Sequence, residues 1–479
     1  LLRLAEVPLN QYDPALTRMI REIHFTGFTC IRLLRYSSDK KIVPYLADTW
    51  FLHPDGRTWE FSLKRGVLFH DGSPVRARDV RFSFERLMNP ALSSPYAQLF
   101  SVIEGADDFI AGRARSVSGI RVLDDQRLQF VLKSSFNYFL SLLALGYSSI
   151  VKEDAEHFSK PFSRGQVISA GPFSFSADAE DGEARDTLLA NPNFVNGRPF
   201  IDRVEIRRDI ANQVEELVAG GLDVSYNITA AAMKSLRERG FTGTEHSYLS
   251  RYCYGLAVNF AKRGAFAAYP ELRRALAMAV DKDALVRGEL EGQALRADTL
   301  LSPELFDAGG AVWLPYDPAE AKRIVDSYRS RTDLAKTFRV AIRDYPAVPR
   351  LAEIEERLGS VFAELGLSVA FDRCPLAKPI DSYRDEYDFI FLGFLPELDL
   401  YSAVEPFINP NGGDNYFGYR NDELFALLED SIAVQDLHER HERFLTIVER
   451  LTKDVFMVPL FFLKSVCAAR SEEHTSELQ

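Results

Sequence analysis

The chain has 479 residues, of which 46% are hydrophobic and 26% charged, and its formal net charge is −12. These proportions are typical of globular proteins and exclude a disordered chain or a collagen-like repeat. The acidic excess provides no broad basic surface for a phosphate backbone, so we expect no nucleic-acid partner. The length corresponds to about three average domains.

Both ends of the sequence are unusual. Leu1–Val7 is typical of a strand and has neither an initiator Met nor a signal peptide, so we expect an upstream segment to be missing. Residues 470–479 match the translation of a common sequencing-library adapter, and we expect them to be foreign to the protein. No run approaches the roughly 18 apolar residues of a membrane span.

The cysteines lie far apart and form no C-x-x-C pair, which argues against a zinc site and against a dense disulfide framework. Two disulfides and none are equally compatible with their spacing. The four residues are Cys30, Cys253, Cys374 and Cys467.

Residues 42–90 contain the clearest local patterns. A turn at His53–Gly56 precedes Thr58–Leu63, whose alternating apolar and polar residues predict a half-buried strand. A second turn at His70–Pro74 precedes a helix whose apolar residues recur at helical spacing, and Asn89-Pro90 ends it.

Helices and strands continue to alternate irregularly, which predicts a mixed α/β fold and argues against a repeating βα barrel. Asp317-Pro318-Ala319-Glu320 has the N-cap acid, first-turn Pro and N3 Glu of a helix start. The other predicted elements are helices at 271–285, 351–365 and 421–451 and a buried strand at 455–463.

In this order, the segments resemble the family 5 bacterial extracellular solute-binding proteins, the oligopeptide, dipeptide and nickel receptors of ABC importers. The signature around Pro44–Trp50, Asp55–Leu63 and Gly66–Pro74 carries most of the likeness, and it is long and specific. Further matching motifs are Tyr12-Asp13-Pro14, Gly171-Pro172-Phe173, Asn191-Pro192-Asn193-Phe194, Gly220–Val224 and Leu272–Asp281.

The resemblance implies a periplasmic-binding-protein-like clamp of two lobes with an extra inserted domain. Lobe one, or domain I, is expected at 1–38, 165–258 and 455–469, and the inserted domain II at 39–164. Lobe two, or domain III, is expected at 259–454. Family members continue past the strand at 455–463, so a closing segment is expected to be absent.

The resemblance also implies a ligand site. Peptide-binding members carry a W-x-x-D segment whose Asp pairs with the α-ammonium group of the ligand. Here Phe394 stands at the Trp position and Glu397 at the Asp position, with Asp399 as the alternative carboxylate. The strand Tyr252–Asn259 resembles the family's crossing strand, so Tyr252, Tyr254 and Asn259 are candidate ligand contacts. Tyr401 is a further candidate.

No pattern supports catalysis. Ser37-Ser38-Asp39-Lys40 satisfies S-x-x-K, but Pro44 follows before a helix could establish the required geometry. His438 and His441 are three residues apart, whereas a zincin needs a spacing of four, and a solvated helix face explains them better. We therefore predict a protein that is not an enzyme and that uses no cofactor and no metal.

The function that the resemblance implies is capture of a peptide or similar small solute and its delivery to an ABC permease at the membrane. The protein is then expected to be a monomer in the periplasm, or outside the cell and attached to the membrane. The alternative is a ligand-sensing domain of a larger regulatory protein with an upstream cytoplasmic module, because the same fold can report on a ligand without transport. The identity of the ligand stays open.

Overall fold

A computed structural model describes residues 1–5, 9, 11–17, 20–38, 41–176, 185–208, 210, 212–228, 230–306, 314–345, 348–376, 378–396, 400–432, 434 and 437–470. The chain divides into two compact units. Unit 1 comprises Leu1–Tyr226, Ser235–Thr244 and Ala468–Gln479, and unit 2 comprises Asn227–Lys234 and Glu245–Cys467. The chain therefore passes from one unit to the other four times, after residues 226, 234, 244 and 467.

Unit 1 contains a sheet in which the strand order is β10-β11-β12-β1-β13. β1 runs parallel to both of its neighbours, with Leu2 opposite Val204 on β12 and Leu4 opposite Val224 on β13. These strands are β1 (Leu2–Ala5), β10 (Phe173–Phe175), β11 (Arg185–Ala190), β12 (Arg203–Arg207) and β13 (Val224–Ile228).

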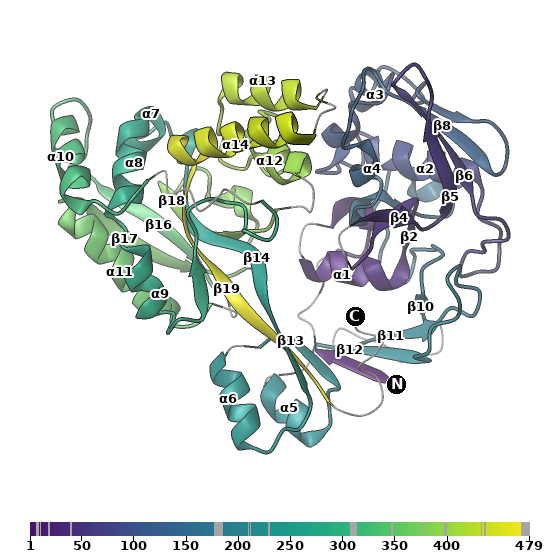
Figure 1. Cartoon of the computed structure of the whole chain (residues 1–479), viewed down its shortest axis with the longest axis horizontal. Coiled ribbons are helices and arrows are strands. Elements are labelled where there is room, and N and C mark those ends of the chain that lie inside the picture. The colour runs from purple at the N-terminus through teal and green to yellow at the C-terminus, as the bar shows by residue number, and fades with distance from the viewer. Residues whose placement is uncertain are drawn as a thin grey trace. The chain divides into compact units, whose positions relative to one another are not determined.

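The rest of unit 1 is built on a four-stranded antiparallel sheet, β5-β6-β8-β7, beside which helices α2, α3 and α4 lie (Figure 1). Two-stranded pairs β2-β9 and β3-β4 complete it. The strands are β2 (Ile31–Arg32), β3 (Leu34–Tyr36), β4 (Ile42–Pro44), β5 (Ala47–Leu52), β6 (Thr58–Leu63), β7 (Ile120–Val122), β8 (Arg127–Val131) and β9 (Ser149–Ile150). The helices are α1 (Ile20–Thr29), α2 (Ala77–Met88), α3 (Ala106–Ile110), α4 (Phe139–Leu142) and α5 (Gln213–Ala219), with short 3-10 turns at Pro14–Leu16, Ala97–Phe100, Gly146–Ser148 and Glu156–Phe158. Helix α6 (Ala230–Glu238) is divided between the units after residue 234.

The predicted strand and helix of residues 58–88 are both confirmed, and their apolar residues meet. On β6, Phe61 is buried, and its ring meets that of Phe130 edge to face at 5.8 Å. The ring of Phe84 on α2 also meets the Phe130 ring edge to face, at 5.1 Å. Such edge-to-face pairs add to the free energy gained by burial.

The Asp13 carboxylate of the Tyr12-Asp13-Pro14 motif forms a buried ion pair with Arg86 of α2, and these two residues are 0% and 1% exposed. Asp13 also accepts hydrogen bonds from the backbone N–H groups of Ala15 at 3.0 Å and Phe162 at 2.9 Å. Arg86 donates from Nε to the His157 carbonyl at 2.6 Å. The pair thus joins three segments that are distant in sequence.

Unit 2 contains strands in the order β19-β14-β18-β16-β17, with β15 on the other side of β19. β16 runs parallel to β17 and β18, whereas β14 runs antiparallel to β18. The strands are β14 (Thr244–Val258), β15 (Ala294–Arg296), β16 (Thr337–Arg343), β17 (Ser368–Cys374), β18 (Phe389–Phe394) and β19 (Met457–Ala469). The helices are α7 (Ala265–Ala268), α8 (Pro270–Ala279), α9 (Lys282–Arg287), α10 (Pro318–Tyr328), α11 (Leu351–Glu364), α12 (Leu400–Ile408), α13 (Asp422–Ser431) and α14 (Leu437–Asp454), with 3-10 turns η5 (Phe260–Lys262) and η6 (Ile380–Tyr383).

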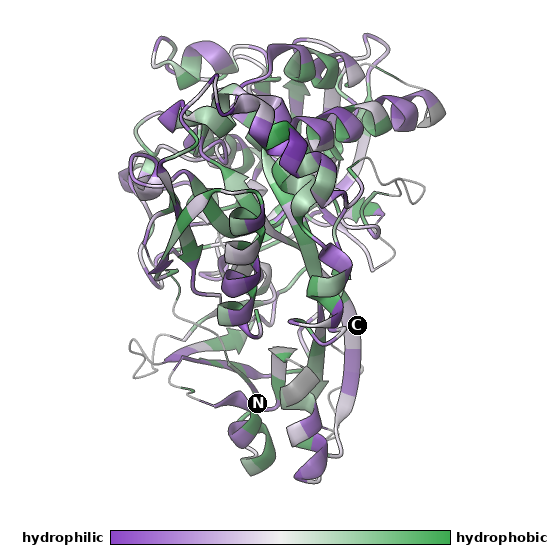
Figure 2. Ribbon diagram, turned by 90° about the vertical axis from the view of Figure 1, so that its left-hand side faces the viewer, coloured by the Kyte–Doolittle hydropathy of each residue, from purple (hydrophilic) through white to green (hydrophobic). Residues whose placement is uncertain are grey.

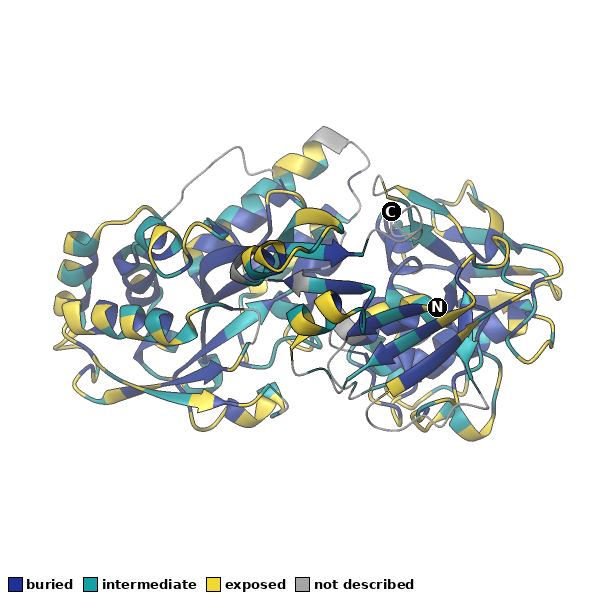
Figure 3. Ribbon diagram, turned by 90° about the horizontal axis from the view of Figure 1, so that it is seen from below, coloured by how far each residue is buried: buried dark blue, intermediate teal, exposed yellow. Residues whose placement is uncertain are grey.

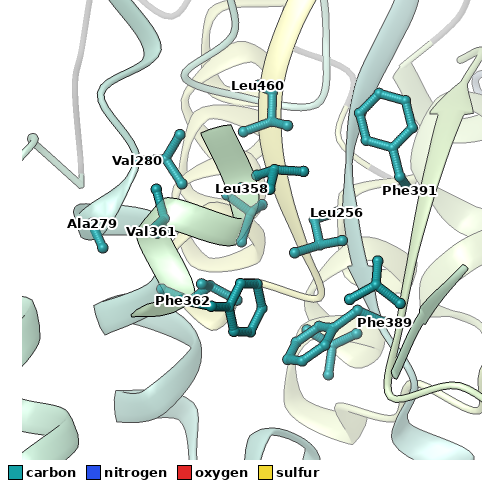
Figure 4. Close-up of a cluster of buried hydrophobic side chains, with 14 of the residues drawn as sticks. Leu256, Ala279, Val280, Leu358, Val361, Phe362, Phe389, Phe391 and Leu460 are labelled. Carbon is teal, nitrogen blue, oxygen red and sulfur yellow. The ribbon is translucent and has the colours of Figure 1, made fainter. Parts of the chain in front are cut away.

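The core of unit 2 lies between these strands and the helices that flank them (Figure 4). Phe389 of β18 contacts Phe362 of α11 with ring centroids 5.5 Å apart, and both residues are fully buried. Hydrophobic residues follow the strands, whereas the outer surfaces of the helices are hydrophilic (Figure 2). Figure 3 shows the matching pattern of burial, with exposed residues on helices and loops.

Two predicted helices differ from the structure. The helix expected at 271–285 is two helices, α8 and α9, because Val280 has an extended backbone and the Asp281 carboxylate caps α9 by accepting from Ala284 N–H at 2.8 Å. The helix expected at 421–451 is likewise α13 followed by α14. The helix starts at Asp317 and near Leu351 are confirmed.

The predicted domain II, 39–164, falls within the range of unit 1, and the predicted domain III, 259–454, falls within that of unit 2. The boundary between domains I and II stays a prediction. Of the segment 470–479, only Arg470 is described, and it donates to the Leu217 carbonyl at 2.9 Å. All four cysteines are free, so the alternative with two disulfides is wrong for this structure.

Candidate functional site

The carboxyl ends of three parallel strands meet at one edge of the unit 2 sheet. β16 ends at Arg343, β17 at Cys374 and β18 at Phe394. In open α/β sheets, ligands bind beyond the carboxyl ends of the strands, so this edge is the candidate site. Cys253 of β14 is opposite Phe394, which places Arg251 and Tyr252 beside the chain that leaves β18.

Three tyrosines gather at this edge. The ring of Tyr252 stacks on Tyr254 with centroids 5.9 Å apart, and Tyr254 meets Tyr345 edge to face at 5.3 Å. The Tyr345 hydroxyl accepts a hydrogen bond from Gly393 N–H at 2.9 Å. A Cβ atom at Gly393 would lie only 2.9 Å from the Tyr254 ring, so glycine is needed where the rings cross β18.

Tyr345 was not among the predicted residues. It lies two residues after β16, and a tyrosine just beyond the carboxyl end of a parallel strand is the pattern that could have indicated it. Burial raises the pKa of Tyr345 and of Tyr254, so both phenols are neutral at physiological pH.

Arg343 adds a positive charge to the same edge. It is buried, and its Nη2 donates to the carbonyls of Leu376 at 2.6 Å and Lys378 at 3.4 Å. Its Nε is buried and has no hydrogen-bond partner among the described residues. The carbonyl groups of Leu376 and Lys378 are neutral, so these bonds leave most of the charge of the buried guanidinium uncompensated. The edge therefore favours an anionic or strongly polar ligand group.

The predicted carboxylates Glu397 and Asp399 lie outside the described residues. The chain leading to them is anchored, because Arg251 Nη1 donates to the Pro396 carbonyl at 2.8 Å. This bond holds the start of their segment against β14, the strand that carries Tyr252. The position of either carboxylate at the site stays a prediction.

Phe394 and Tyr401 are both buried beside this segment. The Phe394 ring meets Phe407 of α12 edge to face at 4.1 Å. The Tyr401 hydroxyl donates to Glu429 Oε1 at 3.0 Å, which links α12 to α13. Packing therefore accounts for both side chains, and a ligand contact by either stays a prediction.

Asn259 directly follows the last residue of β14, whereas Tyr252 lies in the middle of this strand, next to Cys253 opposite the end of β18. Val258 is opposite Phe389, the first residue of β18, so about seven strand residues, or roughly 23 Å, separate Asn259 from Tyr252. The Asn259 amide donates to the carbonyls of Arg384 at 2.6 Å and Tyr387 at 2.8 Å, and the residue is 2% exposed. The structure thus gives Asn259 a structural role and does not bring it together with the tyrosines.

Among the described residues, no group of three or more metal-binding side chains occurs, and no helix is long and apolar enough to cross a membrane. Of the S-x-x-K sequence, Ser37 donates its hydroxyl to the Lys41 carbonyl at 3.0 Å, and Asp39 and Lys40 lie outside the described residues. The His441 ring contacts that of Phe306 at 5.3 Å.

Comparisons with known proteins agree with this architecture. Residues 41–415 match the model of the bacterial extracellular solute-binding proteins, family 5. The periplasmic oligopeptide-binding protein OppA of Salmonella typhimurium is 24% identical over 442 residues, which cover 88% of this chain and 79% of that protein.

Solved structures show the same fold. OppA of Burkholderia pseudomallei superposes with a TM-score of 0.84 at 20% identity, covering 98% of this chain and 94% of that one. NikZ of Campylobacter jejuni in complex with Ni(L-His) gives a TM-score of 0.81 at 20% identity, covering 98% and 94%. The predicted α/β fold of the periplasmic-binding-protein type is confirmed, and the chain belongs to the family 5 bacterial extracellular solute-binding proteins.

Proposed function

We propose that this protein captures a peptide or a similar small solute and delivers it to an ABC permease at the membrane. The family match over residues 41–415 carries the proposal. The named relatives bind oligopeptides or a nickel–histidine complex, and both are polar solutes with amine and carboxylate groups. The protein then acts outside the cytoplasm as a monomer, without chemistry of its own.

The edge of the unit 2 sheet supports an extended, polar ligand. Tyr252 is partly buried and stacks on the buried Tyr254, so its ring offers flat apolar surface, and Arg343 offers positive charge at the same edge. An extended peptide can add its main chain to an exposed strand, which leaves side-chain specificity loose. Transport requires only that a permease distinguish the liganded state from the empty one.

Glu397 is proposed to pair with the α-ammonium group of the peptide, with Asp399 as the alternative. A charge-assisted hydrogen bond contributes about 1.5 to 3 kcal/mol, which is roughly a 10- to 100-fold change in affinity. Glu397→Gln should therefore weaken peptide binding by that factor while an N-acetylated peptide is unaffected. Asp399→Asn is the matched control, and the reverse ranking would assign the role to Asp399.

Native mass spectrometry of the purified protein tests the function. We expect a co-purified solute of peptide size. The protein can then be unfolded, freed of this solute and refolded, and isothermal titration calorimetry with the identified solute measures its affinity. A protein that carries no solute, and whose melting temperature no member of a peptide library raises, would rule out peptide capture.

A further inference from the structure

Two arginines in unit 1, Arg32 and Arg35, lie at the ring of one tyrosine. Arg32 ends β2 and Arg35 lies in β3, and both guanidinium carbons are 5.8 Å from the centroid of the Tyr45 ring. Tyr45 is buried, and its ring meets that of Phe194 edge to face at 6.1 Å. Both guanidinium groups thus contact the ring of the same tyrosine.

Neither guanidinium has a partner among the described residues. The Nε atoms of Arg32 and Arg35 are both buried and make no hydrogen bond. Their terminal nitrogens make no hydrogen bond to a described residue either, and these nitrogens are accessible to solvent. By contrast, the buried Arg86 and Arg208 of the same unit each pair with a carboxylate, Asp13 and Asp186.

Among the described residues, no carboxylate neutralises these two charges. Burial lowers the pKa of Arg32, and the charge of Arg35 lowers it further. A cation–π contact contributes about 0.5 to 2 kcal/mol, which is less than the several kcal/mol needed to remove an ion from water. Burial raises the pKa of Tyr45, so its phenol stays neutral and supplies no counter-charge.

The backbone that carries both arginines is held by hydrogen bonds before any anion binds. Leu46 N–H donates to the Arg32 carbonyl at 3.0 Å, and Ile31 N–H donates to Ser169 Oγ at 3.1 Å. Arg35 is opposite Val43 in the β3-β4 pair, and Tyr45 N–H donates to the Leu33 carbonyl at 3.2 Å. Little ordering of the backbone would accompany binding, which favours affinity.

From this geometry we propose that Arg32 and Arg35 of unit 1 bind the carboxylate group of a small solute. The two accessible guanidinium ends can form parallel N–H···O bonds with both oxygens of a carboxylate, which is the geometry that arginine favours. The proposal rests on solute capture as the proposed function, and it narrows the solute to one with an anionic group.

The variants Arg32→Gln and Arg35→Gln test this site in the full chain. Arg57→Gln is the matched control, because it removes the same charge from an exposed position of unit 1. We expect either site variant to lower the affinity for trialanine at least 10-fold by calorimetry and to leave trialanine amide unaffected, whereas Arg57→Gln changes neither. Arg35→Lys should restore part of the affinity.

A second measurement does not depend on transport. At equal ionic strength, succinate should raise the melting temperature of the unliganded wild-type protein more than chloride does. The site variants should lose this difference between the two anions. If trialanine fails to bind but the succinate effect depends on the arginines, the carboxylate site stands and peptide capture fails. If trialanine binds all variants equally, or if phosphate alone stabilises through the arginines, the carboxylate proposal is overturned.

Discussion

The buried ion pair of Asp13 and Arg86 makes a sharp prediction about stability. Replacing Arg86 by Met keeps most of the side-chain stem but leaves the Asp13 carboxylate, which is 0% exposed, without its cation. The bonds from Arg86 to the carbonyls of His157 and Lys160, at 2.6 and 2.9 Å, are lost at the same time.

The expected loss is large because the two backbone donors that remain on Asp13, from Ala15 and Phe162, only partly replace the guanidinium. Breaking a buried pair by removing one partner costs about 3 to 5 kcal/mol. The exposed pair Arg57–Glu104, with side chains 45% and 40% exposed, is the comparison, and Arg57→Met should cost less than about 1 kcal/mol.

Urea unfolding followed by tryptophan fluorescence measures this difference in unit 1. In a Trp313→Phe background the remaining tryptophans are Trp50 and Trp59, which lie on β5 and β6. The unfolding midpoint of Arg86→Met should shift to a lower urea concentration. The slope of the free energy of unfolding against urea concentration should stay that of the background protein. A loss below about 1 kcal/mol, or one equal to that of Arg57→Met, would refute the reasoning that the pair is a buried structural link.

Two further predictions concern close packing and pH. Gly171→Ala should be strongly destabilising, because its Cβ would lie 2.4 Å from the backbone of Thr29. In Gly27→Ala, on α1, the new Cβ would have no atom within 4 Å, so this variant should be neutral or stabilising. Thermal unfolding of both variants measures the difference. Burial raises the pKa of Glu405 from 4.5 to about 7, so the folded protein binds the extra proton in this range and its stability should fall as the pH rises from about 4.5 to 7. This fall in the free energy of unfolding amounts to up to about 3 kcal/mol, and Glu405→Gln should remove it. Urea unfolding followed by circular dichroism at several pH values measures the effect. A pH profile that is the same in the variant and the wild type would contradict a raised pKa at Glu405.

The local pattern of residues 42–90 predicted its elements well, because turn chemistry and apolar spacing act over short distances. Gly56 and Gly72 have positive φ angles of 70° and 81°, as the two predicted turns require. The break between α8 and α9 was missed because the apolar spacing continues across it, while the capping carboxylate of Asp281 decides the backbone.

The site was predicted less completely, because its residues meet only through sheet register. Tyr345 follows β16, and it comes to the edge through the parallel pairing of β16 with β18, so its position after a strand indicates the site only once that pairing is known. Asn259 was grouped with Tyr252 because their segment resembles the family's crossing strand, yet the extended backbone places them beyond opposite ends of β18. The lack of a partner for Arg32 and Arg35 is likewise visible only in three dimensions.

The four passages of the chain between the units have a consequence for its synthesis. Unit 1 includes residues from Ala468 onward, and Arg470 N–H donates to the Asp223 carbonyl at 2.9 Å. A ribosome must therefore release the chain to about residue 470 before unit 1 is complete. Until then, strand edges that later pair with distant segments stay open to other chains, so this architecture depends on protection from aggregation during translation.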